Sequence, residues 1–161
     1  MIGLVGDGAM QMNNMAELIT AAKYWRDWAD HRFIICVFNS DDLNEVTWVQ
    51  RVMEGDPKFE ASQGIPNVPY HRLAELIGPN GLFVDRPENL GPAWDEALAS
   101  GRPVLLEVKT DPEVPPMPPH LTFWQVQNLT STLVKGDPNE EGVIRGTVRQ
   151  VLSSVPLGKH E

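Results

Sequence analysis

The stretch Ile2-Gly3-Leu4-Val5-Gly6-Asp7-Gly8-Ala9-Met10 decides the fold, and it leads into a helical pattern that begins near Asn14. Its apolar run, residues 2–5, predicts a buried strand, because short apolar runs bounded by turn signals are typical of strands covered on both faces. The glycines of the turn allow a backbone to approach a ligand, and a helix N-terminus offers N–H groups suited to phosphate. Asp7 adds a carboxylate, the hard oxygen ligand that Mg²⁺ or Ca²⁺ prefers. The turn therefore predicts half of a metal–diphosphate site.

A second apolar run, residues 33–38, predicts the next buried strand, which ends at Asn39-Ser40-Asp41-Asp42-Leu43. A Gly-Asp-Gly turn alone is also a common surface turn, so its context decides its meaning. Two parallel neighbours joined by a helix bring their carboxyl ends together, at the edge where open α/β sheets bind ligands. We therefore expect Asp7 to lie close to the loop that begins at Asn39.

Strands and helices alternate along the rest of the chain. Further strands are predicted over 81–84 and 103–108, and helices over 14–28, 43–53, 69–77 and 86–98; the segment 54–69 is predicted to be a loop at the entrance of a site or an ordinary surface loop. This alternation predicts an α/β fold with three αβα layers around a mainly parallel sheet. The residues of the first helix expected to face the sheet are Leu18, Ala21, Ala22 and Trp25.

The last part of the sequence predicts a helical tail. The proline cluster 115–119 predicts a polyproline exit from the sheet. An amphipathic helix over 121–134 follows, with Trp124 and Leu129 as expected anchors, and 135–138 stops it. A final helix over 141–155 carries the apolar residues Val143, Val148, Val151 and Leu152.

Composition limits the function classes. The chain has 161 residues, of which 42% are hydrophobic and 22% charged, as in one globular domain. Its net charge of −9 argues against nucleic acid or anionic membranes as partners. Cys36 is the single cysteine, so no internal disulfide can form, which favours a reducing compartment. No signal peptide or membrane-length apolar run is visible, and we expect a cytoplasmic location.

These motifs resemble the thiamine diphosphate signature, in which Gly-Asp-Gly is followed, after a helix and a strand, by Asn-Asn. Residues 37–39 with Asp42 and Leu43 resemble the same loop in the pyruvate oxidase and acetohydroxyacid (acetolactate) synthase group. Residues 102–108 and 115–119 resemble the last strand and the proline-rich exit of that group. The resemblance covers roughly residues 2–135.

The resemblance implies thiamine diphosphate held through Mg²⁺. The cofactor-binding residues that it implies are Gly6, Asp7, Gly8, Ala9, Met10, Asn39 and Leu43. The metal ligands that it implies are Asp7, Ser40, Asn39 and the backbone carbonyl of Asp42. The family has its asparagine ligand where this chain has Ser40, and the spacing from Asp7 is longer than usual. A shorter hydroxyl requires that the loop moves in, that a water fills the gap, or that Asn39 or Asp41 takes its place.

The resemblance also implies a larger enzyme. Residues 1–135 would form an N-terminally truncated cofactor-binding domain, and residues 136–161 a C-terminal helical tail. The catalytic glutamate that activates the cofactor belongs to the missing pyrimidine-binding domain, and FAD, in some members, to a missing central domain. The expected substrate is a 2-oxo acid such as pyruvate, the expected assembly a homodimer or homotetramer, and the isolated chain is expected to be inactive.

Two other interpretations remain open. A Rossmann-like dinucleotide-binding domain would use the same strand–turn–helix, although the turn lacks the third glycine and places an acid beside the expected pyrophosphate. A non-catalytic domain that kept the fold and lost the site is the other, and Ser40 leaves it open.

Overall fold

The computed structural model describes residues 1–115 and 122–154 of the chain. Their contacts divide the chain into two compact units. The first unit comprises residues 1–42 and 65–110, and the second comprises residues 43–64 and 111–161. Each unit has its own core.

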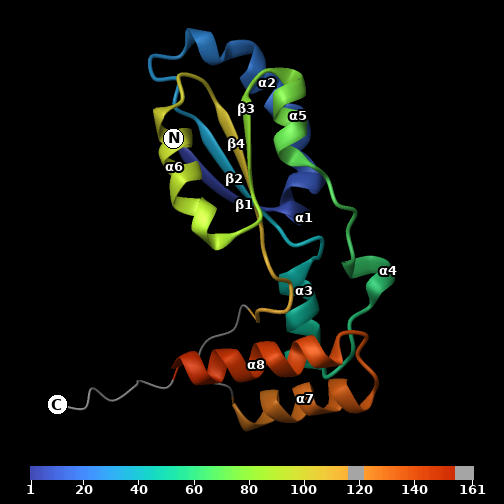
Figure 1. Cartoon of the computed structure of the whole chain (residues 1–161). Coiled ribbons are helices and arrows are strands. Elements are labelled where there is room, and N and C mark those ends of the chain that lie inside the picture. The colour runs from blue at the N-terminus through green and yellow to red at the C-terminus, as the bar shows by residue number, and fades with distance from the viewer. Residues whose placement is uncertain (116–121, 155–161) are drawn as a thin grey trace, which may run out of the picture. The chain divides into compact units, whose positions relative to one another are not determined.

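The first unit contains a four-stranded parallel sheet (Figure 1). Its strands are β1 (Ile2–Gly6), β2 (Ile34–Asn39), β3 (Asn80–Val84) and β4 (Val104–Lys109). Their order is β1-β2-β4-β3, so the first two predicted strands are neighbours as expected. This order places the carboxyl ends of β1, β2 and β4 side by side at one edge.

Helices cover the sheet on both faces (Figure 1). Helical turns begin at Asp7, earlier than predicted, and run through α1 (Asp7–Ala9), the π-turn η1 (Met10–Asn14), α2 (Met15–Tyr24) and the 3₁₀ turn η2 (Trp25–Asp27). The others are α5 (Tyr70–Ile77), the 3₁₀ turn η4 (Pro87–Asn89) and α6 (Leu90–Ala99). In Figure 1, α2 and α5 lie on one side of the sheet and α6 on the other. The predicted three-layer αβα fold is confirmed.

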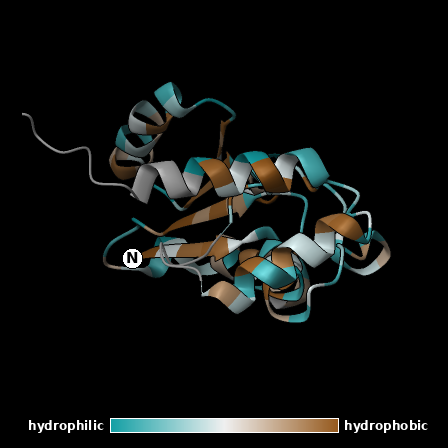
Figure 2. Ribbon diagram, turned by 90° about the horizontal axis from the view of Figure 1, so that it is seen from below, coloured by the Kyte–Doolittle hydropathy of each residue, from teal (hydrophilic) through white to brown (hydrophobic). Residues whose placement is uncertain are grey.

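Two apolar layers result from the alternation of side chains along the strands. The layer under α2 and α5 contains Met10, Leu18, Val37, Tyr70, Ala74 and Leu105. The layer under α6 contains Ile34, Cys36, Val84, Ala97, Val104 and Leu106. Figure 2 shows the strands as the most continuously hydrophobic ribbons. At Gly81 of β3 a Cβ would collide with the backbone of His71, so glycine is required for α5 to pack this closely.

The prediction that residues 2–5 form a buried strand is wrong in one respect. The strand forms, but β1 is an edge strand, and the side chains of Ile2 and Leu4 are 53% and 64% exposed. Both share the α6 side of the sheet with Ile34 and Cys36, their partners in register. The core residues of α6 pack against β2, β3 and β4, so this side of β1 stays uncovered.

The second unit is a group of helices. They are α3 (Asn44–Val49), the π-turn η3 (Gln50–Glu54), α4 (Glu60–Gln63), α7 (Phe123–Val134) and α8 (Glu140–Ser154). Its core consists of Trp48, Val52, Leu129 and Val143, with Leu133 beside them. The segment 54–69, predicted to be a loop, therefore contains one short helix.

The predicted anchors of this unit are partly confirmed. Leu129 and Val143 are buried, whereas Trp124 is 50% exposed, so its prediction as an anchor is wrong. Several other apolar residues of this unit's helices are exposed as well: Val46, Val49, Met53 and Val148. Residues 116–119 of the proline cluster and the side chains of Val151 and Leu152 lie outside what the structure describes. Within residues 1–115 and 122–154, no helix has the length and apolar character needed to cross a membrane.

Candidate functional site

Asp7 is the centre of the candidate site. It is the first helical residue after β1, with Gly6 in an extended conformation before it, and it is only 3% exposed. Its Oδ1 accepts a hydrogen bond from the backbone N–H of Gly8 at 2.9 Å. The strand-to-helix turn thus fixes a buried carboxylate at the carboxyl edge of the sheet.

The loop after β2 meets this carboxylate, as the sequence predicted. The backbone N–H groups of Ser40 and Asp41 both donate to Asp7 Oδ2 at 2.7 Å. Ser40 Oγ lies 3.5 Å from Asp7 Oδ2 and donates to the carbonyl oxygen of Asp42 at 3.1 Å. Three oxygens of different chemistry, a carboxylate, a hydroxyl and a carbonyl, therefore converge within one small volume.

Asn39 points toward β4. Its Nδ2 donates to Glu107 Oε1 at 2.6 Å and to Asn67 Oδ1 at 3.3 Å. Because both neighbours are acceptors, the amide orientation is fixed, and Asn39 Oδ1 is buried with no hydrogen-bond partner among the described residues. Asp41 Oδ1 is likewise buried and has no hydrogen-bond partner among the described residues. Buried acceptors of this kind are normally satisfied by a donor, a water or an ion.

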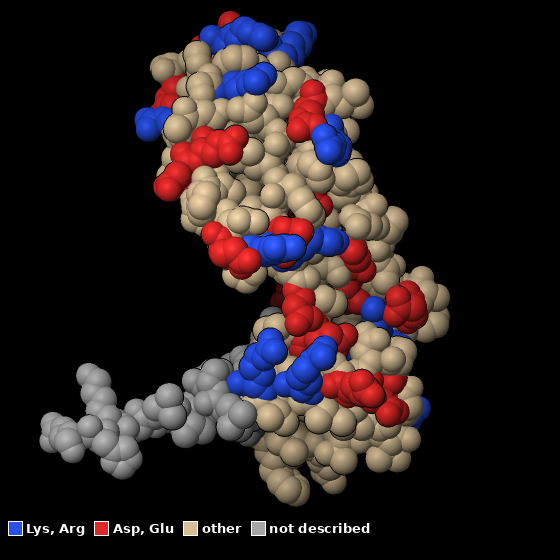
Figure 3. Space-filling view, in the orientation of Figure 1, with Lys and Arg blue, Asp and Glu red and all other residues tan. Residues whose placement is uncertain are grey.

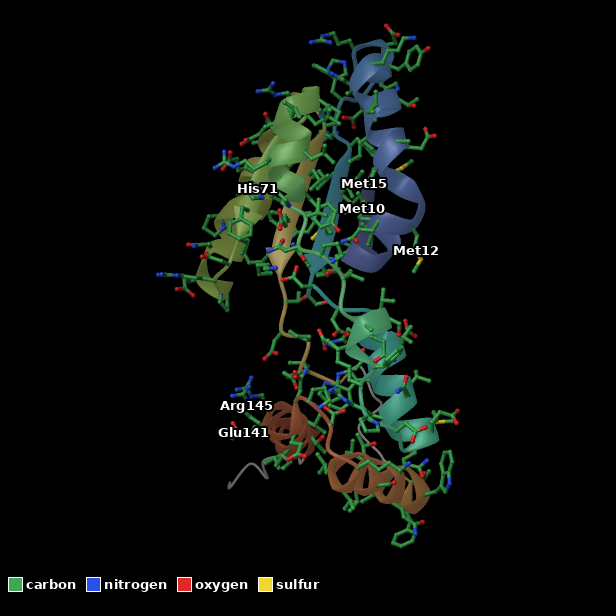
Figure 4. The ribbon with its side chains drawn as sticks, turned by 90° about the vertical axis from the view of Figure 1, so that its right-hand side faces the viewer. Met10, Met12, Met15, His71, Glu141 and Arg145 are labelled. Atoms are coloured by element: carbon green, nitrogen blue, oxygen red, sulfur yellow. The ribbon has the colours of Figure 1, made fainter. Side chains whose placement is uncertain are left out.

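Glu107 and His71 form a polar network that the sequence analysis did not identify as functional. Glu107 interrupts the apolar run of β4 and is 2% exposed. Its Oε2 accepts from the backbone N–H of His71 at 3.1 Å and lies 2.5 Å from His71 Nδ1. His71 is on α5, as Figure 4 shows. A charged residue inside an otherwise apolar strand was the available signal, since a buried carboxylate requires partners.

Met10 holds the opening helix against the sheet. Its side chain is 1% exposed and packs in the core, whereas Met12 is 67% exposed and points away from the sheet (Figure 4). The backbone N–H of Met10 donates to the carbonyl oxygen of Asp7, so Met10 supports the turn rather than presenting its side chain to a cofactor. Tyr70 lies beneath the same turn, where its O–H donates to the carbonyl oxygen of Asp7 at 3.2 Å. Burial raises the pKa of Tyr70, so its hydroxyl stays protonated as a donor.

Leu43, a predicted cofactor-binding residue, belongs to the second unit, where it precedes α3 and its N–H donates to Gln63. The remaining implied cofactor residues, Gly6, Gly8 and Ala9, lie consecutively around Asp7. Among the described residues, no group of three or more His, Cys, Asp or Glu side chains is arranged to hold a metal ion. Charged side chains of both signs are interspersed over the face seen in Figure 3.

Comparison with known proteins identifies the family. Residues 1–108 match the family model of the thiamine pyrophosphate enzyme, C-terminal TPP binding domain. A Bacillus subtilis protein, YdaP, described as thiamine pyrophosphate-containing, is 31% identical over 134 residues, which are 83% of this chain and 22% of that protein. A Methanocaldococcus jannaschii protein described as an acetolactate synthase large subunit is 31% identical over 119 residues, 73% of this chain and 19% of that protein.

A solved structure is similar as well. It is the thiamine diphosphate-dependent 4-hydroxybenzoylformate decarboxylase of Rhodococcus jostii RHA1, with a TM-score of 0.58 and 26% identity. The match covers 68% of this chain and 19% of that one. The chain thus spans about a fifth of the length of these relatives. These similarities favour thiamine pyrophosphate over the Rossmann-type alternative, and the chain belongs to the family of C-terminal TPP-binding domains of thiamine diphosphate-dependent enzymes.

Proposed function

We propose that this domain binds the diphosphate of thiamine diphosphate through Mg²⁺ held by Asp7, Ser40 and the carbonyl oxygen of Asp42. The convergence of these three oxygens is the observation that supports the proposal. Mg²⁺ prefers hard oxygen ligands and is commonly bound by few protein groups together with phosphate oxygens and waters. One carboxylate with two neutral oxygens fits this preference.

The buried acceptors beside the site support the same proposal. Asn39 Oδ1 and Asp41 Oδ1 have no hydrogen-bond partner within the described part of the chain. A cation, or a water bound to it, would satisfy such oxygens. Asn39 therefore remains an alternative amide ligand, held by Glu107 from the other side of its side chain. Ser40, with its shorter side chain, would coordinate directly or through a water.

Backbone groups would bind the diphosphate itself. The helical segment that starts at Asp7 places the backbone of its first turn at the edge where the carboxylate lies. N–H groups at a helix N-terminus and the partial positive charge there favour phosphate oxygens. The N–H of Gly8 already donates to Asp7, so it acts first by orienting that carboxylate.

The proposed reaction is that of a larger enzyme on a 2-oxo acid such as pyruvate, of pyruvate oxidase or acetolactate synthase type. One relative is described as an acetolactate synthase subunit, and another is named for 4-hydroxybenzoylformate, which is itself a 2-oxo acid. When bound, thiamine diphosphate supplies the carbanion chemistry, and the protein supplies placement and electrostatics. A pyrimidine-binding domain with the activating glutamate, FAD in some members and a dimeric or tetrameric assembly would complete the enzyme. The isolated chain should then turn over no pyruvate, and measurable decarboxylation by it would contradict this assignment.

Calorimetric titration with thiamine diphosphate tests the site. Binding should require Mg²⁺ and disappear with chelator. Ser40→Ala should weaken Mg²⁺ about tenfold, as loss of a group that ligates or orients the metal does, and Ser40→Asn should bind at least as well as the natural chain. If only Ser40→Asn binds, the natural site has lost its function. If neither the natural chain nor Ser40→Asn binds thiamine diphosphate, the half-site needs its partner domain. Mg²⁺-independent binding would refute the metal assignment.

Gly6→Ala distinguishes an effect on the stability of the fold from an effect on cofactor binding. Gly6 has φ −77° and ψ 155°, which any residue adopts, and a Cβ there would meet no atom within 4 Å. We expect the free energy of unfolding to stay equal or to rise by about 0.4–1 kcal/mol, because alanine restricts the unfolded chain. We expect thiamine diphosphate binding to fall roughly tenfold to a hundredfold, since crowding a close-packed contact costs about 1–3 kcal/mol.

Gly3→Ala is the matched control for Gly6→Ala. Gly3 lies in the same strand, and a Cβ there also meets no atom within 4 Å. Thermal unfolding and calorimetric titration of both variants provide the measurement. Equal binding by the two variants would show that no ligand approaches Gly6.

A further inference from the structure

Lys109 lies beside the candidate site at the end of β4. It is opposite Asn39 in the register of β2 and β4, and the N–H of Thr110 donates to the carbonyl oxygen of Asn39 at 3.0 Å. The two strands therefore stay paired up to the loop that carries Ser40 and Asp42. From this fixed position Lys109 Nζ reaches Asp41 Oδ2 at 2.7 Å.

Asp41 has an unusual backbone conformation. With φ 58°, it is the one non-glycine residue among those described that has positive φ. The left-handed region is energetically unfavourable for a residue with a Cβ, although Asp and Asn tolerate it best among such residues. The structure holds Asp41 at three points: its N–H donates to Asp7 Oδ2, its carbonyl oxygen accepts from Ile65 N–H at 3.1 Å, and its carboxylate binds Lys109.

The position of Asp41 in the chain gives this conformation its significance. Its neighbours on either side, Ser40 and Asp42, supply the hydroxyl and the carbonyl oxygen of the proposed cation site. With Asp41 in this left-handed conformation, Ser40 Oγ lies 3.1 Å from the carbonyl oxygen of Asp42 and 3.5 Å from Asp7 Oδ2. If Asp41 relaxed to an ordinary conformation, the peptide that follows it would rotate and carry the carbonyl of Asp42 with it.

We propose that Lys109 is a positioning residue whose ion pair with Asp41 holds the 40–42 turn in its metal-binding conformation. Lys109 does not touch the metal. Its effect on Mg²⁺ rests on the proposed function, whereas its effect on the turn does not. The side chains of Lys109 and Asp41 are 30% and 37% exposed, so solvent partly screens the pair. Its loss should raise the population of turns that have left this conformation by about threefold to tenfold.

The competing role for the same ammonium group is direct binding of the diphosphate. In that case Asp41 would hold Lys109 back from the ligand. The two roles predict opposite effects of Asp41→Asn, which removes the charge of Asp41 and keeps a residue that tolerates positive φ. Loss of positioning weakens binding, whereas release of a phosphate-binding lysine strengthens it.

Hydrogen exchange of the full chain without cofactor tests the positioning role directly. The amide protons of Ser40 and Asp41 should exchange about threefold to tenfold faster in Lys109→Met and in Asp41→Asn than in the natural chain. The double variant should exchange no faster than either single variant. Lys135→Met is the control, because Lys135 pairs with Asp56 at 2.6 Å in the other unit. Unchanged exchange in Lys109→Met would overturn the proposal.

Titration of Mg²⁺ at fixed thiamine diphosphate gives the second measurement. Lys109→Met and Asp41→Asn should each raise the Kd of Mg²⁺ by about threefold to tenfold, with no further increase in the double variant. Tighter binding by Asp41→Asn with weaker binding by Lys109→Met would overturn the positioning role. A natural chain that binds no cofactor at all would refute the proposed function instead, and the exchange result would still decide the role of Lys109.

Discussion

Asp7→Asn is expected to abolish Mg²⁺-dependent binding of thiamine diphosphate, with a loss of more than about 100-fold. Replacing a group that only orients a metal ligand already costs about 10–100-fold, and Asp7 is the proposed charged ligand itself. In the natural chain both oxygens of the Asp7 carboxylate accept hydrogen bonds from backbone N–H groups. In the variant an NH₂ group replaces one of these oxygens and faces an N–H donor. Leaving such a donor unsatisfied should lower the free energy of unfolding by about 1–3 kcal/mol.

The two effects of Asp7→Asn are measured separately. Calorimetry below the melting temperature reports binding, and denaturant unfolding reports stability. Asp95→Asn is the control, because Asp95 is an exposed carboxylate on α6. If folded Asp7→Asn binds Mg²⁺ and cofactor like the natural chain, Asp7 is not a ligand.

The contact between Asp7 and Ser40 could be predicted from the sequence because it follows from strand order. Parallel strands joined by one helix place their carboxyl ends together, whatever the side chains are. The pattern of glycines and apolar residues thus sufficed for a parallel α/β sheet and for the contact between Asp7 and the loop after β2. The same pattern did not predict interactions between residues that are far apart in the sequence. Lys109 and Glu107 reach Asp41 and Asn39 over 68 residues, and no local pattern encodes such pairs.

Burial was the other feature that the sequence predicted poorly. An apolar run such as residues 2–5 indicates a strand, but only the position of α6 determines that Leu4 is exposed. In α3 the apolar positions Val46 and Val49 point outward. The buried face of that segment instead includes Arg51, which its charge would have placed at the surface. A partner far along the chain made this burial favourable.

That partner is Asp137, and removing it should produce the largest loss of stability in the second unit. Arg51 Nε and Nη2 donate to the two carboxylate oxygens of Asp137 at 2.9 and 2.8 Å, with side chains 1% and 0% exposed. Asp137→Ala leaves a buried guanidinium without its counter-charge. We expect the free energy of unfolding to fall by about 3–5 kcal/mol, as measured by urea unfolding.

Two comparisons identify the cause of this loss. Asp56→Ala, which removes an exposed pair with Lys135, should cost less than about 1 kcal/mol. The double variant Arg51→Met with Asp137→Leu should be less destabilised than either single change, because no charge stays buried. If Asp137→Ala cost no more than Asp56→Ala, the buried pair would not contribute to stability.

The same pair predicts a pH dependence. Burial alone would raise the pKa of Asp137, but hydrogen bonds from Arg51 and from the N–H groups of Lys58 and Asn139 outweigh it and hold the pKa below the usual 3.8. Its stabilisation is therefore complete above pH ~4 and is lost as the pH falls through the lower folded-state pKa. Glu113 acts in the opposite sense, because burial raises its pKa above 4.5 and its contribution is lost as the pH rises. Glu113→Gln should therefore make the loss of stability in acid steeper, and Asp137→Asn should make it shallower.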